Sequence, residues 1–511
     1  MVLNLKQTER ADSPEKLNLK RGNILQAAAK GLVLLVGVVA IGGVVRAQEM
    51  QMPQESHASH AAVSLKPIEP KFPKLGKPQE QASGPLMNLE QVLRIAAESN
   101  PTLRQAEAEI RAAKARKAQA GLYPNPTIAY AGDEIRGGAA GGGKQGFFLQ
   151  QAIVTGGKLG LSKNVFSGDV KLAEIEAEEQ KMRVQSAVRI SFLSVLAAQE
   201  QLEIRAELAG IAQDSAETQK RLMNTGQADE SELLDAEVEA QRARLAARTQ
   251  ESRLGEQWRS LAAVMGRPDL PLTTVGGQLD RGWPDLSQEK VMDAMAFDSP
   301  AIRIANETES RAKAVVARAA RESVPDVVVR AGLEDNHEPV PGSGAKGWEG
   351  IAEVSTQIPL FNRNQGNIAA ARADLERAVQ EKNRVALTLR ERAAEVADQY
   401  ANARFTVMHY RDEILPRASK SYSLLVNKYG QMLASYPRVL DAQHRLYGLE
   451  SEYIAALETV WTSGISLEGY LLTDGLEAPT RPGEVDRTIR ETNLPMSGRT
   501  SATVGSITKN P

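Results

Sequence analysis

Two methionines and two histidines lie close together near the amino terminus: Met50, Met52, His57 and His60. Thioether sulfurs and imidazole nitrogens are ligands for soft or borderline ions such as copper, silver and zinc. The stretch 48–87 is rich in Pro, Lys, Gln and Ser, a composition typical of an extended, poorly ordered segment. Two interpretations therefore stand: a leader that binds metal ions, and a plain polar leader.

No other group of residues has the composition and spacing of a catalytic site. His337, His409 and His444 are scattered, and the chain contains no Cys. The glycines at 137–143 lack the Lys-Ser/Thr and helix pattern that follows a phosphate-binding loop. The net charge of −2 gives no indication of nucleic-acid binding. The sequence predicts a protein that is not an enzyme, needs no cofactor and binds no nucleic acid.

The amino terminus has the pattern of an export signal. Basic residues precede an apolar run at 31–41, and small residues at 45–47 suit a signal-peptidase site. We predict cleavage after Ala47. The alternative is an uncleaved anchor, but the apolar run is short for a span of ~20 residues. Because no Cys lies near the site, the sequence excludes a lipoprotein anchor.

The sequence repeats itself once at a nearly constant distance. Asn100-Pro101 is matched by Ser299-Pro300 after 199 residues, and Leu234-Asp235-Ala236 by Leu440-Asp441-Ala442 after 206 residues. A unit of this size is too long for a solenoid repeat, so it indicates a duplicated domain. We predict six segments: a signal peptide at 1–47, an extended leader at 48–87, a first repeat at 88–273, a linker at 274–287, a second repeat at 288–474, and a disordered tail at 475–511.

Each copy contains a very long helical stretch. Residues 160–225 contain no Pro, and apolar residues recur there at helical spacing: Val184, Val188, Phe192, Val195 and Leu202. At ~1.5 Å per residue, a helix of this length would be roughly 90 Å long. Residues 366–429 have the same pattern with one interruption at Pro416. A break at Gly226 or Gly430 then precedes a returning helix, which predicts two long hairpins packed as coiled coils.

Two pairs of strands separate the helices. Residues 126–131 and 147–154 flank one loop, and residues 327–333 and 351–358 flank another. In the last strand Ala352, Val354 and Thr356 alternate with polar residues, as in a transmembrane barrel. Four strands cannot close a barrel, and open edges are not tolerated in hydrocarbon. Three copies would supply 12 strands. The alternative is a pair of ordinary hairpins on a soluble periplasmic coiled-coil scaffold.

Several short sequence stretches are typical of one protein family. They are Asn100-Pro101, the run 120–126, the run 151–158 and, as the sharpest match, Ile358-Pro359-Leu360-Phe361-Asn362-Arg363-Asn364-Gln365-Gly366. In their order and spacing, residues 88–474 resemble the TolC-like outer-membrane efflux factors. Within that family the chain is most similar to the branch that serves cobalt-zinc-cadmium and related heavy-metal exporters.

The resemblance implies a fold and a function. The fold is mainly α with a β-barrel part: a homotrimer with a 12-stranded barrel in outer-membrane lipid and a tube of long helices in the periplasm. Its partners would be a periplasmic adaptor protein and an inner-membrane RND pump. The expected function is passive conduction of heavy-metal cations to the outside. A duct for drugs or other small organic molecules remains the alternative.

The resemblance also locates a gate at the hairpin tips, which would contact the adaptor. In the family these tips carry acidic residues that line the closed channel. Asp441 matches one gate carboxylate, and Glu232 approximates another in the first copy. The position of a second family carboxylate holds Arg438. Alternatively, Asp235 and Asp441 are helix N-cap or first-turn residues, where carboxylates are favoured. The candidate tip residues are Gly226, Glu232, Asp235, Gly430, Arg438 and Asp441.

Overall fold

A computed structural model describes residues 86–136, 142–337, 347–431 and 433–478. All of them belong to the second of two compact units, Pro67–Pro511. The predicted signal peptide and the Met/His leader residues lie outside the described residues, as does the tail beyond Ala478. Among the described residues, no helix combines the length and apolar character needed to cross a lipid bilayer.

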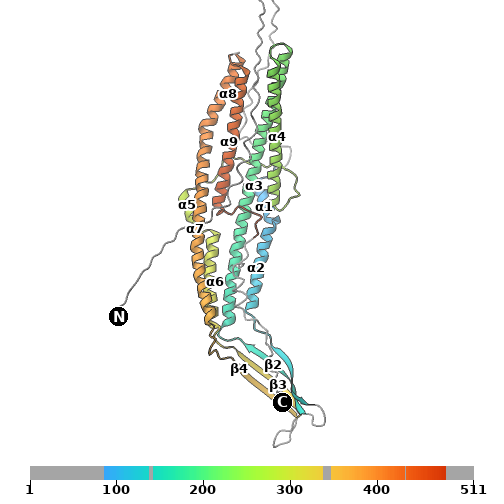
Figure 1. Ribbon diagram of the computed structural model, residues 1–511, viewed down its shortest axis with the longest axis vertical. Coiled ribbons are helices and arrows are strands. Elements are labelled where there is room, and N and C mark those ends of the chain that lie inside the picture. Colours follow the sequence, from blue (N-terminus) through green and yellow to red (C-terminus); the bar gives the residue numbers. More distant parts are fainter. Residues whose placement is uncertain (1–85, 137–141, 338–346, 432, 479–511) are drawn as a thin grey trace, which may run out of the picture. The chain divides into compact units, whose positions relative to one another are not determined.

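The described elements follow the same order twice (Figure 1). The first repeat consists of α1 (Leu89–Ser99), α2 (Pro101–Ala120), β1 (Thr127–Arg136), β2 (Gly142–Ile153), α3 (Lys158–Asn224) and α4 (Glu230–Val264). The second consists of α5 (Gln288–Phe297), α6 (Pro300–Arg321), β3 (Val327–Asn336), β4 (Gly347–Thr356), α7 (Gln365–His409), η1 (Tyr410–Ile414), α8 (Leu415–Gly430) and α9 (Tyr436–Glu468). The predicted fold class is confirmed: the chain is mainly helical, duplicated, and contributes four strands.

The matched dipeptides of the two repeats start equivalent helices. Asn100 caps α2, because its side chain accepts a hydrogen bond from the Thr102 N–H, and Pro101 occupies the first helical position. Ser299 and Pro300 have the same roles at the start of α6. Proline is favoured there since its missing N–H would have no helical partner. The repeat detected in the sequence is therefore a repeat of helix starts.

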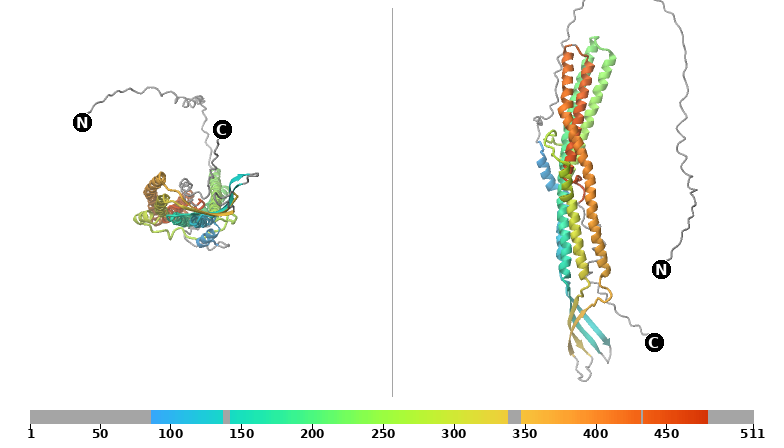
Figure 2. Two further views of the ribbon diagram at one scale, coloured as in Figure 1. Left: turned by 90° about the horizontal axis from the view of Figure 1, so that it is seen from below. Right: turned by 90° about the vertical axis from the view of Figure 1, so that its left-hand side faces the viewer.

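The four strands form one antiparallel sheet in the order β1-β2-β3-β4. The strand pairs of the two repeats are joined by the pairing of β2 with β3. Because α3 begins five residues after β2 and continues unbroken, the sheet lies at one end of the helices (Figure 2). At ~1.5 Å per residue, the 67-residue α3 is roughly 100 Å long. The turn that follows α3 is therefore far from the sheet.

The predicted apolar stripe on α3 forms the main core. Val184, Val188, Phe192 and Val195 are buried, and Leu202 packs against them. Partners come from α4, α7 and α9, including Trp258, Tyr400 and Ile454. Nearer the turn, Ala240 of α4 is buried against Ala212 and Ala216 of α3. Small residues there let the two helices approach closely, as predicted for the coiled coil.

The second long helix is interrupted where the sequence places Pro416. Residues Tyr410–Ile414 form a π-helical turn, and the Leu415 N–H donates to the Tyr410 carbonyl, five residues back. Proline has no N–H and clashes with the preceding turn of an α-helix, so the chain widens at this point. The helix resumes as α8 and ends at Gly430, where the break was predicted.

The linker is more ordered than its composition suggests. Val275 is fully buried, and its backbone N–H and carbonyl exchange hydrogen bonds of 2.9 and 3.0 Å with the Gln199 side chain. It also forms a parallel bridge with Met87. These contacts fix the entry to α1 and the exit from α4 at the centre of α3.

Candidate transport surfaces and hairpin tips

One face of the sheet is apolar and exposed. The register aligns Ile128, Leu149 and Ala331 across three strands, and Tyr130, Phe147 and Leu333 next to them. The Tyr130 and Phe147 rings are in contact, with centroids 5.2 Å apart. Large exposed side chains of this face are Ile128, Tyr130, Phe147, Leu149, Leu333, Trp348 and Val354. A surface of this kind is suited to an apolar environment.

The opposite face is polar and contains ion pairs. Lys144 on β2 lies 3.3 Å from a carboxylate oxygen of Glu334 and 2.8 Å from one of Glu349. Asn336 also donates to Glu349, at 2.7 Å. Arg330 stacks on the Phe148 ring, 3.7 Å from its centroid, and lies 3.6 Å from Glu353. The alternation predicted for residues 352–356 thus extends over all four strands.

The two outer strands each pair on one side only within the described residues. β1 pairs with β2, and β4 pairs with β3, so one chain leaves two sheet edges open. Unpaired backbone groups at such edges bind further strands readily. In hydrocarbon they would be costly, at several kcal/mol for each unsatisfied group. The sheet therefore needs neighbours from other chains if it lies in a membrane.

A short junction joins the sheet to the helices. Gly157 precedes α3 with a φ of 69°, and Asn364 precedes α7 with a φ of 62°, so both turns are left-handed. Lys158 is buried and pairs with Asp326 at 3.0 Å, while the Thr155 N–H donates to the same carboxylate at 2.8 Å. The motif around Gly156-Gly157 is thus a turn that aligns strand and helix.

The first hairpin tip is built around Gly226 and Asp229. Gly226 has a φ of 72°, which favours glycine, and allows the chain to leave α3. Asp229 is the N-cap of α4: it accepts from the Glu232 N–H at 2.9 Å and from the Ser231 hydroxyl at 2.6 Å. These hydrogen bonds lower the pKa of Asp229, the Ser231 bond first. Glu232 and Asp235 are exposed on the first two turns of α4.

The second tip lies between Gly430 and the start of α9. Ser435 is the N-cap residue of α9, and Arg438 and Asp441 are exposed close to this end of the helix. Asp441 is paired with Arg445, one turn further on, at 3.1 Å. The N-cap or first-turn interpretation is wrong for Asp235 and Asp441, since each is the sixth residue of its helix. Their gate role stays a prediction.

An open groove lies between α3 and α4 near the first tip. Its volume is about 810 Å³, and its lining combines exposed apolar residues of α4 with charged residues of both helices. Leu234, Val238 and Leu245 are 53, 51 and 69% exposed. Lys220, Glu237 and Arg244 lie beside them. Such a mixed surface is suited to another helix.

One buried and one half-buried carboxyl group between α3 and α9 were missed by sequence reasoning. Glu450 is 4% exposed, and burial, followed by the charge of Glu207, raises its pKa to about 8. Burial, followed by Asp280 and Glu203, raises the pKa of Glu200 to about 7. Tyr447 and Tyr453 are buried in the same seam. No sequence pattern signals this seam, because only the packing of α9 on α3 buries Glu450.

The metal prediction concerns residues outside the described part of the chain. Met50, Met52, His57 and His60 all lie there. Within the described ranges, no group of three or more His, Cys, Asp or Glu residues is placed to hold a metal ion. His337 and His444 instead lie near single carboxylates, Asp335 and Glu239.

The fold and surfaces define a class: a duplicated protein of long helical hairpins whose sheet has one apolar, exposed face and one polar face. Comparison with known proteins identifies the family. Residues 92–267 and 298–471 match the model of the outer membrane efflux protein family, and the chain belongs to this family.

Curated relatives support the branch inferred from the sequence. The cobalt-zinc-cadmium resistance protein CzcC of Cupriavidus metallidurans is 26% identical over 397 residues, which cover 76% of this chain and 91% of that protein. The nickel-cobalt-cadmium resistance protein NccC of Alcaligenes xylosoxydans xylosoxydans is 24% identical over 280 residues, or 53% of this chain and 60% of that protein. The predicted resemblance to the heavy-metal resistance branch is confirmed.

Solved structures show the same fold. The crystal structure of CusC matches with a TM-score of 0.61 and 17% identity, covering 79% of this chain and 97% of that chain. The outer membrane protein VceC of Vibrio cholerae matches with a TM-score of 0.58 and 18% identity, covering 76% and 97%.

Proposed function

We propose that this chain is the outer-membrane duct of a tripartite RND-type efflux system and that three copies form it. Each copy would contribute four strands to a 12-stranded barrel, while the long helices form a periplasmic tube. The observation that carries this proposal is the two-faced sheet with two open edges in an outer membrane efflux protein. Trimers that resist mild detergent, and ion conductance in planar bilayers, test it. A soluble monomer in the periplasmic fraction would instead favour the scaffold alternative.

The cargo in this proposal is heavy-metal cations, conducted passively. Its support is the similarity to CzcC and NccC, whose names refer to resistance to cobalt, zinc, cadmium and nickel. The test is growth of a deletion strain on zinc, cadmium, cobalt, nickel, copper and silver salts, with a panel of drugs. Sensitivity to one or two metals, restored by the wild-type chain, supports metal efflux. Sensitivity to drugs alone makes the protein a duct for organic molecules.

The partners in this proposal are an adaptor protein in the periplasm and a pump in the inner membrane. We assign the groove between α3 and α4 to contact with a helix of the adaptor. Its exposed Leu234 and Val238 would supply apolar contact, and Lys220 and Glu237 would set the register. Val238→Asp should abolish co-purification with the adaptor and leave the trimer intact. Leu387→Asp, at another exposed apolar site on α7, is the control.

The gate in this proposal lies at the tips, where threefold symmetry would repeat Asp441 and Glu232. Like charges brought together in a narrow pore repel each other and attract cations. Asp441→Asn should reduce the preference of the channel for cations, measured as a reversal potential in a salt gradient. Glu251→Gln, which removes a carboxylate from another exposed ion pair, on α4, is the control.

The amino-terminal segments complete the proposal. Mass spectrometry of the purified protein should place the mature amino terminus at Gln48, after a cleaved signal peptide. If the leader binds metal, the full-length protein should bind Ag⁺ in a calorimetric titration. Replacing His57, His60, Met50 and Met52 together should then remove one binding event.

A further inference from the structure

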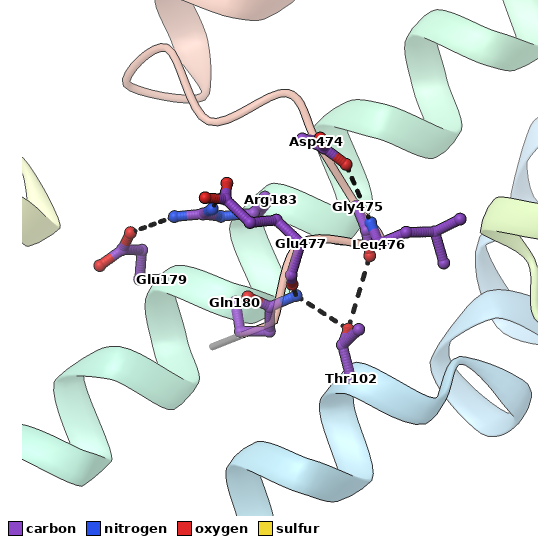
Figure 3. Close-up of polar contacts among 8 residues, drawn as sticks. All are labelled: Thr102, Glu179, Gln180, Arg183, Asp474, Gly475, Leu476 and Glu477. Atoms are coloured by element: carbon purple, nitrogen blue, oxygen red, sulfur yellow. Dashed lines mark hydrogen bonds and ion pairs between the residues drawn. The ribbon is translucent and has the colours of Figure 1, made fainter. Parts of the chain in front are cut away.

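The chain does not leave the helices when α9 ends at Glu468. Glu468 pairs with Arg189 of α3 at 3.0 Å, and the backbone then turns through two left-handed residues, Tyr470 and Leu471. From there it runs back along α3, so that Gly475 lies against Val184 and Ala187. Figure 3 shows the last part of this course, residues Asp474 to Glu477, between α3 and the start of α2.

Neutral side chains of the first repeat hold the backbone of this segment. Gln180 of α3 donates to the Glu477 carbonyl at 3.1 Å and to the Thr102 hydroxyl at 2.8 Å (Figure 3). Asn100 donates to the Gly475 carbonyl at 3.4 Å. A hydrogen bond within the segment stabilises its turn, because the Asp474 carboxylate accepts from the Leu476 N–H at 3.3 Å.

Gly475 has no room for a side chain. A Cβ atom at this position would lie 2.8 Å from the Cβ of Ala187 and 3.1 Å from a methyl group of Val264. The Asn100 amide that reaches Gly475 also donates to the Val264 carbonyl at 2.8 Å. The end of α4, the α1–α2 junction and the carboxy-terminal segment therefore meet at one point. This contact fixes the second repeat to the first.

An ion pair closes the contact and permits its release. Arg183 of α3 is largely buried and donates both to Glu477 and to Glu179, one turn away. The Glu477 side chain is 60% exposed, whereas that of Glu179 is 11% exposed. If Glu477 leaves, Arg183 keeps Glu179 as its counterion, so no buried charge loses its partner. The segment can therefore detach without leaving an isolated charge in the protein.

We propose that Asp474–Glu477 is a releasable clasp that locks the end of α9 onto α3 and α2. Closed, the clasp holds the second hairpin, α8 and α9, in its resting position against the first repeat. Open, it frees the end of α9 and lets that hairpin shift. In the channel, which rests on the function proposed above, release would raise the resting conductance.

Two truncations of the full chain separate the clasp from the residues beyond it. One ends at Thr473 and lacks the clasp; the other ends at Ala478 and keeps it. Amide hydrogen exchange of the purified protein should be about tenfold faster at the end of α9 and in α3 around 180–187 only in the shorter chain. Equal exchange in both chains overturns the proposal.

Point variants test the mechanism within the intact chain. Gly475→Ala should reproduce the faster exchange, whereas Gly448→Ala, at an open position on α9, should not. Glu477→Gln should loosen the clasp less than Gly475→Ala, and its effect should vanish in 1 M salt, where the wild-type ion pair is screened too. Exchange that is unchanged in Gly475→Ala contradicts the role of this segment.

Bilayer recordings then separate the clasp from the channel. If the wild type conducts and the chain ending at Thr473 shows the same resting conductance as the chain ending at Ala478, the clasp does not control the hairpin. If the wild type conducts no ions, the channel function fails, and the exchange comparison still decides whether the clasp exists.

Discussion

Replacing Glu450 with glutamine should make the protein more stable in alkaline solution. Glu450 is buried between α9 and α3, and among the described residues its Oε2 has no hydrogen-bond partner. Burial and the charge of Glu207 raise its pKa from 4.5 to about 8. The buried phenol of Tyr447, which is hydrogen-bonded to Glu207, faces the same seam. Glutamine keeps the shape of the side chain and removes the charge that this environment disfavours.

The sign of the effect follows from the raised pKa. The folded protein keeps the proton on Glu450 over a range in which the unfolded chain has lost it. The contribution of this group to stability is therefore fully present below pH 4.5, falls as the pH rises towards 8, and is constant above that. Since one pKa unit corresponds to ~1.4 kcal/mol, the loss is at most about 5 kcal/mol.

The assay is thermal unfolding of the purified protein in detergent from pH 5 to pH 9. The difference in unfolding midpoint temperature between Glu450→Gln and the wild type should be near zero at pH 5. This difference should increase steadily in favour of the variant up to about pH 8. Glu200, whose pKa is also raised, is present in both proteins and cancels in the difference. Glu251→Gln, an exposed control on α4, should give a flat difference. A flat profile for Glu450→Gln, or a gain that grows towards pH 5, would refute the reasoning.

Two further substitutions test the packing and the sheet. Arg311→Ala removes the cation 2.6 Å from the buried Asp169 and should cost about 3–5 kcal/mol of unfolding free energy, measured by denaturant titration. Arg248→Ala, in the exposed pair with Glu251, should cost less than about 1 kcal/mol. Val354→Arg places a charge on the apolar sheet face and should make the free energy of membrane insertion less favourable by about 2–4 kcal/mol. The neighbouring Ser355→Arg, on the polar face, should leave this free energy unchanged. Equal losses of unfolding free energy for the two arginine variants would contradict the importance of the buried ion pair. Equal losses of insertion free energy for the two strand variants would contradict the assignment of the sheet faces.

Local patterns predicted much of the helical fold. Val184, Val188, Phe192 and Val195 recur at the spacing of one helix face, and that spacing alone requires a buried stripe. The alternation at residues 352–356 predicted the two faces of β4 for the same reason. Patterns of this kind depend only on the geometry of the element that carries them, so no knowledge of distant contacts is needed.

Contacts between distant residues were not predictable in the same way. Asp474-Gly475-Leu476-Glu477 has the composition of a turn, and we placed the boundary of the disordered tail at Gly475. In the structure Gly475 is buried, and Glu477 pairs with a residue 294 positions earlier in the chain. Likewise, Glu450 is an ordinary surface residue by type, and only its packing against α3 buries it. Burial of this kind depends on how helices dock, which no local pattern records.

The two copies of the duplicated unit differ in the continuity of their long helix. In the first, α3 is continuous over 67 residues. In the second, the equivalent helix is broken by the π-turn before Pro416, and the returning helix α9 carries the buried Glu450. The clasp that follows α9 then attaches to α3 near its middle. A π-helical turn, a buried acid and a detachable contact thus all lie in the second repeat, and the acid and the detachable contact face α3 of the first. Any movement between the repeats is therefore expected to displace the second hairpin against a fixed α3.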